Sequence, residues 1–291
     1  MLVPLRMQVG ARTVATIHRR LTRVSWSLDD VLAGTALTLP PLAGDGYLLT
    51  SVPATLRAEV TPAGLLAVVR QRYTRFHADL AIGHDAWSGA LAGDRRAAIK
   101  RKTAKIAAMS GGRLDVRTYR TAADLAVFSP IAQRLSALTY QSRLLDSGFP
   151  TDAVDLRQLR ELAARDRLRA WLLYVDDRPA AYLCCTASGA TLCYDHVGHD
   201  PALAALSPGT VLQAAALRDL FADRFARFDF SEGEGQHKRL FATHGTACVD
   251  LLLLRPTWRN RAVAALLAGF DRTIAASRSR LPHTLARRLR R

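Results

Sequence analysis

The segment from Leu168 to Phe230 restricts the fold more than any other part of the chain. It begins with three short stretches in which apolar residues recur with period two. Turn residues separate these stretches, Asp176-Asp177-Arg178-Pro179 at the first joint and Ser188-Gly189 at the second. The pattern predicts three antiparallel strands at 169–175, 180–187 and 191–197. A helix and a fourth strand follow, and this order of elements predicts a layered α/β structure.

The sequence predicts where the helix of this segment begins and which elements follow it. We expect the Ser207 side chain to cap it, and Pro208 suits the first turn because its missing N–H is not needed there. Residues 225–230 (FARFDF) then read as the fourth strand, and the run from Glu232 to Gly235 (EGEG) breaks it before a second short helix. Acidic residues entering a glycine turn beside a helix N-terminus indicate a site for anion binding and acyl transfer.

Charge and cysteine content narrow the class of protein. The chain has 41 Lys and Arg against 25 Asp and Glu, a net charge of +16. Such a charge favours polyanionic partners such as nucleic acid, anionic membrane or phosphate-bearing cofactors. The four cysteines follow no disulfide or metal-binding spacing, so we expect reduced thiols, a cytoplasmic protein and no metal site. We expect neither a signal peptide nor a membrane span, since no stretch approaches about 18 to 20 apolar residues.

Outside the central segment, periodicity and breaker residues predict further elements. We expect strands at 14–17, 47–50, 73–82 and 114–119. We expect helices at 61–72, 94–110, 122–144 with an interruption near Ser129-Pro130, 155–166 and 258–277. His77 falls inside the strand at 73–82, and we interpret it as a partly buried structural histidine.

Two helices of this set concentrate positive charge. The helix at 94–110 has a basic face that is either solvated or binds lipid headgroups, phosphate or nucleic acid. Because no aromatic residues interleave with its cations, binding to single-stranded nucleic acid is disfavoured. The basic residues are Arg95, Arg96, Lys100, Arg101, Lys102 and Lys105.

The second basic region is the C-terminal helix with the tail that follows it. From residue 255 to 291 the chain has ten arginines and one acidic residue, Asp271. One alternative is peripheral contact with an anionic membrane at its inner face. The other is a helix docked on the core with a solvated tail. The predicted apolar face consists of Val263, Leu266, Leu267, Phe270 and Ile274.

Five motifs follow one another along the chain, RRAAIKRK at 95–102, Thr139-Tyr140-Gln141, SPGTVL at 207–212, Phe228-Asp229-Phe230 and His237-Lys238. In this order they resemble the GNAT acyltransferases, and more narrowly the CelD/BcsL-like branch related to the FemAB group. The resemblance covers roughly residues 45 to 250. It implies a GNAT fold with a mixed, mostly antiparallel central sheet flanked by helices, and a degenerate second GNAT-like half. It also implies a partial N-terminal half at 1–110 ending in the basic helix, an acyltransferase core at 111–255, and an amphipathic helix with a basic tail at 256–291.

The resemblance implies an N-acyltransferase with acyl-CoA or acetyl-CoA as co-substrate and direct attack by an amine within a ternary complex. Two neighbouring strands would separate to admit the pantetheine arm, and the pyrophosphate would lie at the N-terminus of the helix after the third strand. A helix N-terminus favours a diphosphate through its free N–H groups and positive end. The family's Gln/Arg-x-x-Gly-x-Gly/Ala loop is absent, and an ordinary capped helix is the alternative. The expected cofactor-binding residues are Ser207, Pro208, Gly209, Thr210 and Val197.

An amine nucleophile is protonated near neutral pH, so the reaction needs a base or a water-linked relay. Candidates lie at the ends of the two strands expected to separate, and Glu232 is the first choice and His196 the second. The family usually has Tyr where this chain has His237, which with Lys238 could orient the substrate or protonate the thiolate. For each residue a structural salt bridge or turn hydrogen bond is the alternative. The candidate catalytic residues are Glu232, His196, Asp195, Asp229, His237, Lys238 and Tyr140.

The acceptor is expected to be an amine on a small molecule, a sphingoid-type lipid, or an envelope or polysaccharide precursor. One alternative is a FemAB-type transferase that takes aminoacyl-tRNA, whose basic surface would bind RNA phosphates with a steep salt dependence. The other is a non-catalytic GNAT-fold binding module in envelope or polysaccharide assembly. The sequence contains no Gly-x-Ser-x-Gly elbow, Walker loop or His-Glu-x-x-His motif that would favour another chemistry.

Overall fold

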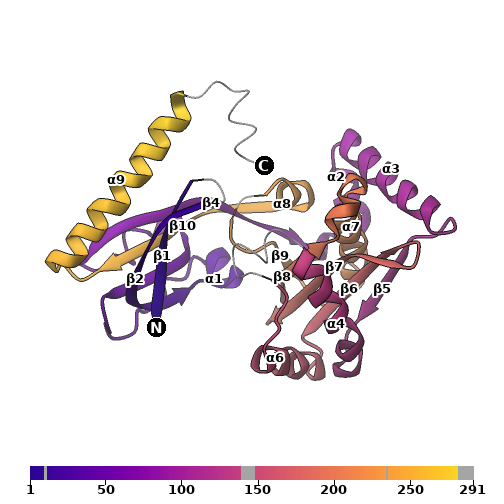
Figure 1. Ribbon diagram of the computed structural model, residues 1–291, viewed down its shortest axis with the longest axis horizontal. Coiled ribbons are helices and arrows are strands. Elements are labelled where there is room, and N and C mark those ends of the chain that lie inside the picture. Colours follow the sequence, from indigo (N-terminus) through magenta and orange to yellow (C-terminus); the bar gives the residue numbers. More distant parts are fainter. Residues whose placement is uncertain (10–11, 139–147, 234, 281–291) are drawn as a thin grey trace. The chain divides into compact units, whose positions relative to one another are not determined.

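The computed structural model describes residues 1–9, 12–138, 148–233 and 235–280. Contacts divide the chain into two compact units, one of Met1–Thr74 with Thr246–Arg291 and one of Arg75–Gly245 (Figure 1). The first unit combines the two ends of the chain because β10 (His244–Leu254) pairs antiparallel with β3 (Gly46–Pro53). The sequence divides the chain by position, into 1–110, 111–255 and 256–291, whereas the two units are defined by contacts. The division by position stays a prediction.

The first unit is built on strands in the order β1-β2-β3-β10-β4. β1 pairs antiparallel with β2, whereas β2 and β3 are parallel. Residues of β10 alternate between two apolar clusters, with Leu251 and Leu253 in one and Leu252 and Leu254 in the other. A strand buried on both faces needs a continuous apolar run, which explains the sequence of β10. The remaining strands are β1 (Leu2–Val9), β2 (Arg12–Ser25) and β4 (Leu66–Asp79), which continues into the second unit.

The helix α9 (Trp258–Arg280) packs on this unit through one narrow face. Val263 and Leu267 are buried in the same cluster as Leu252 and Leu254. Leu266 is 52% exposed, so the expectation that it shares the buried face is wrong. Positions i and i+4 lie one above the other on a helix, whereas the neighbour of Leu267 points elsewhere. The docked alternative therefore holds for α9, and the tail at 281–291 lies outside the described residues.

The second unit contains the central segment of the sequence analysis. Its strands follow the order β4-β9-β8-β7-β6-β5, and all described pairs are antiparallel except β8 with β9. The predicted order of three antiparallel strands, a helix and a fourth strand is confirmed, and with it the mixed, mostly antiparallel sheet flanked by helices. The elements are β5 (Asp115–Tyr119), β6 (Leu168–Val175), β7 (Arg178–Ser188), β8 (Thr191–His199), α7 (Pro208–Leu220) and β9 (Arg227–Asp229).

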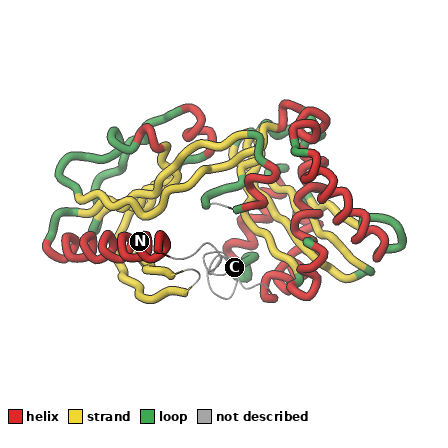
Figure 2. Tube along the Cα trace, turned by 90° about the horizontal axis from the view of Figure 1, so that it is seen from above, coloured by secondary structure: helices red, strands yellow, loops and turns green. Residues whose placement is uncertain are grey.

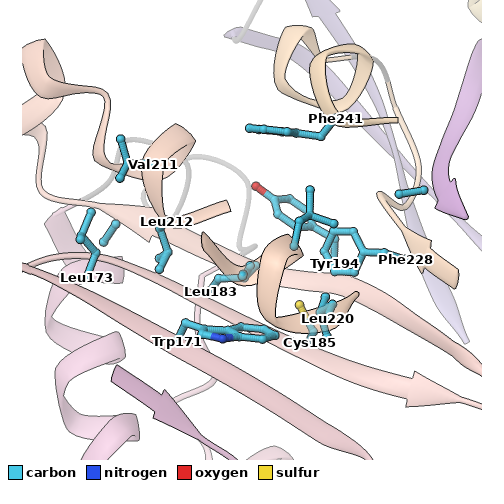
Figure 3. Close-up of a cluster of buried hydrophobic side chains, with 14 of the residues drawn as sticks. Trp171, Leu173, Leu183, Cys185, Tyr194, Val211, Leu212, Leu220, Phe228 and Phe241 are labelled. Atoms are coloured by element: carbon cyan, nitrogen blue, oxygen red, sulfur yellow. The ribbon is translucent and has the colours of Figure 1, made fainter. Parts of the chain in front are cut away.

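Helices cover both faces of this second sheet (Figure 1, Figure 2). On one face α2 (His84–Ala90), α3 (Gly93–Met109) and α7 enclose an apolar core. Trp171 belongs to this core and lies near Leu183 and Cys185, and Tyr194 lies beside Phe228 (Figure 3). On the other face α4 (Ala122–Leu138) and α6 (Ala153–Ala164) pack on a second cluster. Because both faces are buried, every residue of β6 is buried.

Two predicted helical features are wrong. The helix expected at 61–72 is a turn followed by β4, since Gly64 adopts a φ of 84°, which ends any helix begun at Thr61. The apolar residues that suggested a helix belong to a strand with apolar contacts on both faces. The expected break near Ser129-Pro130 is absent too, because α4 continues through an exposed Pro130. The remaining short helices are α1 (Leu28–Ala33), α8 (Gln236–Phe241), η1 (Ala54–Leu56), η2 (Leu80–Ile82) and η3 (Pro201–Leu206).

Within the described ranges, no helix combines the length and the apolar character that crossing a membrane requires. The four cysteines are thiols outside any disulfide, and three of them, Cys184, Cys185 and Cys248, are buried. Cys193 is half-buried on β8.

Candidate active site

The parallel strands β8 and β9 pair over a short distance and then diverge. Their last aligned pair is Cys193 with Asp229, where β9 ends. β8 continues to His199 and remains paired with β7. Past the end of β9, the Phe230 amide donates a hydrogen bond to the Phe76 carbonyl of β4 at 3.0 Å. The two strands thus form a fork, which is the arrangement expected where a ligand enters a sheet between parallel strands.

Polar side chains gather on one face of the sheet at this fork. Residues paired across neighbouring strands share a face, so Cys193 and Asp229 lie on the same side as His77, which pairs with Asp229 on β4. Phe228 and Tyr194 point to the opposite side and belong to the apolar core. The fork therefore has a polar side and an apolar side.

Asp195 occupies a β-bulge on β8, just beyond the fork. Cys185 pairs with Tyr194 and Cys184 pairs with His196, which leaves Asp195 as the additional residue. A bulge changes the direction of its side chains, and as a result the consecutive residues Asp195 and His196 line the same pocket.

The Asp195 carboxylate is held by β7 while remaining open to this pocket. It accepts hydrogen bonds from the amide and the Oγ1 of Thr186, both at 2.7 Å. Asp195 is exposed toward the pocket, but the protein around its carboxylate displaces water, and this desolvation, together with the negative charge of Asp229, raises the pKa of Asp195 to about 6 against the effect of the Thr186 bonds. A carboxylate with this pKa is ionised at pH 7 and is a stronger base than an ordinary aspartate.

The pocket has a volume of about 510 Å³ and lies between α4, the start of α6 and β8. The His196 ring packs edge-on against Phe149, with ring centroids 5.5 Å apart. Burial lowers the pKa of His196, against the effect of a hydrogen bond to the backbone of Gly148. His196 is therefore a neutral wall residue near pH 7. The other lining residues are Gln133, Ser136, Ala137, Pro150, Thr151, Asp152 and Asp155.

Asp229 is fully engaged in a buried ion pair. Its carboxylate accepts bonds from Arg75 Nη2 at 2.6 Å, Arg75 Nε at 3.3 Å and the Ser231 amide at 2.9 Å. Asp229 is 1% exposed and Arg75 is 7% exposed. A carboxylate this well compensated serves to hold structure and local charge rather than to accept a proton from a substrate.

Lys238 of α8 completes the cluster. Its Nζ donates hydrogen bonds to the carbonyls of Glu232 and Ser231. Burial lowers the pKa of Lys238 to about 8, and the nearby Arg75 lowers it further, whereas Asp229 and Glu232 raise it. Asp229 interacts electrostatically with both Lys238 and Asp195, which places all three groups in one neighbourhood.

The remaining expected catalytic residues are Glu232, which acts electrostatically on Lys238, and His237 and Tyr140. Glu232, the first choice for the base, has an exposed side chain on the turn after β9, and it is its carbonyl that holds Lys238. His237 lies in α8, but its side chain is outside the described residues. Tyr140 also lies outside them. The roles of these residues stay predictions.

The expected cofactor end of the site differs in detail from its prediction. Ser207 stands at the N-cap position of α7 with a φ of 54° and makes no side-chain cap hydrogen bond, so the predicted cap is wrong. In this left-handed conformation its carbonyl instead accepts bonds from the amides of Thr210 and Val211. Gly209 has open space where a side chain would start, and Pro208 follows Ser207 directly. The first turn thus offers the Gly209 amide and a positive helix end to an anion, a partial fit to a diphosphate. Val197 is half-buried in the part of β8 that pairs with β7 and lies beyond the last residue paired with β9.

Sequence reasoning missed Arg75 and underestimated the burial of His77. Both residues sit at alternate positions of β4, and this alternation was the available signal. His77 is 5% exposed and stacks on His244 with centroids 5.4 Å apart. Burial and the neighbouring His244 lower its pKa, and its Nδ1 lacks a hydrogen-bond partner. No group of three or more His, Cys, Asp or Glu suited to a metal ion occurs in the ranges that the structure describes.

Comparison with known proteins identifies the domain that contains the fork. The family model described as an acetyltransferase (GNAT) domain matches residues 93–239, half of the chain. No curated protein matches the chain.

The chain is also similar in fold to solved structures of low sequence identity. The C-terminal domain of a protein named as a lysylphosphatidylglycerol synthetase from Agrobacterium fabrum has a TM-score of 0.52 at 12% identity, over 78% of this chain and 72% of that one. L-PGS from Bacillus licheniformis has a TM-score of 0.48 at 10% identity, over 75% and 71%. A GCN5-related N-acetyltransferase from Kribbella flavida has a TM-score of 0.40 at 14% identity, over 73% and 69%.

Proposed function

Because the chain belongs to the GNAT acetyltransferase family, we propose that it transfers an acyl group from an activated donor to an amine at the fork between β8 and β9. One observation supports this site above others. The charge of the buried Asp229 acts on both Asp195 and Lys238, and the pKa values of these two groups, about 6 and about 8, bracket neutral pH. Groups displaced toward the working pH are suited to general base and general acid catalysis.

In the proposed reaction the amine nitrogen attacks the acyl carbonyl carbon and a C–N bond forms. Asp195 accepts the proton that the nitrogen loses. The Lys238 ammonium stabilises the developing oxyanion and then donates a proton to the leaving group as its bond to the acyl carbon breaks. We favour Asp195 over Glu232 as the base because Asp195 is among the described residues that line the pocket and Glu232 is not.

We propose acyl-CoA or acetyl-CoA as the donor, the usual co-substrate of GNAT domains. When bound it would supply a thioester, which is activated for attack by an amine. The Gly209 amide and the N-terminus of α7 would hold the diphosphate of the donor. The part of β8 beyond its pairing with β9, which includes Val197, would line the path of the pantetheine arm. We also assign the chain to the CelD/BcsL-like branch, on the motif order in the sequence.

A second donor class deserves a direct comparison. The neighbour from Agrobacterium fabrum is named as a lysylphosphatidylglycerol synthetase, a name that points to an aminoacyl group. An aminoacyl-tRNA donor would use the basic residues of α3 for its phosphates. The carbonyl chemistry at Asp195 and Lys238 would be the same, with an ester oxygen in place of the thioester sulfur as the leaving atom.

The proposal is tested by thiol release from a panel of acyl-CoAs in the presence of amines, followed by mass spectrometry of the acylated product. Asp195→Asn and Lys238→Met should each lower kcat by about 10²- to 10⁴-fold, the usual contribution of an acid or base. Asp177→Asn is the matched control, since Asp177 is exposed on the β6–β7 turn with a φ of 59° that Asn tolerates.

Three outcomes separate the candidates. Thiol release that depends on Asp195 and Lys238 supports the acyl-CoA enzyme. Transfer from aminoacyl-tRNA without any thiol release from acyl-CoA would mean that the donor is aminoacyl-tRNA and not acyl-CoA. Transfer from neither donor, together with no binding of any CoA species by calorimetry, would favour the non-catalytic module.

A further inference from the structure

One side of α9 stays exposed after the helix has docked on the strands of the first unit (Figure 1, Figure 2). Trp258 is 75% exposed and Leu266 is 52% exposed. Ala262 and Ala265, which lie between them, are exposed as well. Intervals of three and four residues place these four side chains on one face of the helix, and Trp258 and Leu266 are about 12 Å apart along its axis. We call this stripe the outer face of α9.

The opposite side of α9 is held to the first unit and is not available to a partner. Val263 and Leu267 are buried in the apolar cluster beneath the helix. One turn further along, Asp271 pairs with Arg70 of β4 at 3.1 Å. Rotation of the helix would break both contacts, so the outer face is the side that α9 presents to its surroundings.

Arginines border the outer face along both edges. Arg261 and Arg272 are exposed on one edge, and Arg259 is exposed on the other. The guanidinium of Arg259 lies 5.2 Å from the ring centroid of Trp258. Asp271 is the one acidic residue between positions 255 and 291, and its charge is compensated by the ion pair on the docked side. The outer face is therefore apolar along its centre and cationic along its border.

We propose that the outer face of α9 lies on the surface of an anionic lipid bilayer, with the helix parallel to the membrane plane. The Trp258 indole suits the headgroup level, because it combines a large apolar ring with one N–H donor. Leu266 enters the acyl boundary, and the bordering arginines extend to the lipid phosphates. This contact goes beyond acyl transfer and does not depend on it.

Charge decides between a bilayer and a second copy of the chain as the occupant. Pairing the outer faces of two copies would bring Arg259, Arg261 and Arg272 of both copies together, and like charges oppose such an interface. Anionic lipid phosphates complement the same border. The apolar face expected from the sequence is the docked one, so the bilayer contact belongs to the opposite side of the helix.

Tryptophan fluorescence of the full chain tests the inference without any transfer chemistry. Trp26, Trp87 and Trp171 are each at most 4% exposed. An aqueous quencher such as acrylamide therefore reaches Trp258 first. Vesicles of phosphatidylcholine and phosphatidylglycerol should protect this indole from acrylamide and shift its emission to shorter wavelength, because the ring leaves water. Vesicles of phosphatidylcholine alone should do neither, and Trp258→Phe should remove the change.

A charge on the outer face should disrupt the contact more than the same charge elsewhere. Leu266→Asp should weaken binding to the anionic vesicles by about tenfold or more, since the burial of a leucine side chain is lost and a carboxylate meets the lipid phosphates. Val127→Asp is the matched control, because Val127 of α4 is apolar and 59% exposed and the substitution changes the net charge equally.

Three results would overturn the inference. An equal loss of binding in Leu266→Asp and Val127→Asp would show that net charge alone holds the chain on the bilayer. Vesicle binding that leaves the emission of Trp258 unchanged would show that another surface makes the contact. A shift of this emission that follows protein concentration in the absence of lipid would show that a second copy of the chain covers the outer face.

Discussion

At the scale of single residues, Asp195 and Lys238, the proposed base and the proposed acid, have pKa values that are displaced toward each other. Burial is the main cause for both Asp195 and Lys238, because it disfavours the charged form of each group. Asp229 adds to the displacement of Asp195 and limits that of Lys238. The same buried carboxylate therefore adjusts the base and the acid together.

The first prediction concerns pH dependence. Asp195 must be ionised to accept a proton, so kcat/KM should rise as the pH increases through about 6. Lys238 must be protonated to donate one, so kcat/KM should fall above about 8. A plot of kcat/KM against pH should therefore be bell-shaped, and it is measured in a series of buffers at constant ionic strength. Asp195→Asn should abolish the acidic limb, and an acidic limb lost instead in Glu232→Gln would transfer the role of base to Glu232.

The second prediction concerns the ion pair of Arg75 and Asp229. Asp229→Ala leaves a buried guanidinium without its carboxylate and should lower the free energy of unfolding by about 3–5 kcal/mol, measured by urea denaturation. The double variant Arg75→Met/Asp229→Leu removes both charges and should recover much of this loss. An equal loss in the single and double variants would show that the uncompensated charge is not the cause.

At the scale of elements, backbone irregularities position the site. The bulge at Asp195 directs two consecutive side chains into one pocket, and the early end of β9 opens the fork. Alternation in the sequence predicted β6, β7 and β8 well, because both alternation and turn residues are local. It contained no sign of the bulge, since the additional residue is defined only by its partner strand.

The third prediction tests the docking of α9 with a matched pair of neighbouring leucines. Leu267 is fully buried and Leu266 is 52% exposed. Leu267→Ala should lower the free energy of unfolding by about 2–5 kcal/mol, and Leu266→Ala should change it by less than about 0.5 kcal/mol. Thermal or urea unfolding measures both. Similar small effects at the two positions would mean that this face of α9 does not pack on the sheet in solution.

At the scale of the whole molecule, the excess of positive charge has no single location. The basic residues of α3 belong to the second unit, and the arginine-rich C-terminal region belongs to the first. The docking of Val263 and Leu267 removes those two side chains from any membrane surface. Contact with an anionic membrane remains a prediction, and it now depends on charge and on the outer face of α9.

The fourth prediction follows from this distribution of charge. Deletion of residues 278–291 removes six arginines and should weaken binding to vesicles of mixed zwitterionic and anionic lipid by about tenfold or more, since each basic residue near such a surface contributes about 1 kcal/mol. Co-sedimentation at two salt concentrations measures the effect, and purely zwitterionic vesicles are the control. Unchanged binding to the anionic vesicles would contradict the membrane contact.

The sequence alone determined the order of elements in the second unit, the strand segments with their turns, and the acidic and basic residues at the ends of β8 and β9. These features follow from local periodicity and turn chemistry, which a single chain carries in its own order of residues. Only the tertiary structure decided that residues 66–72 belong to the strand β4 and not to a helix, that Arg75 neutralises Asp229, and that Asp195 and His196 line one pocket. Each of these depends on partners distant in the sequence, and such pairings are fixed by packing and charge compensation rather than by local pattern.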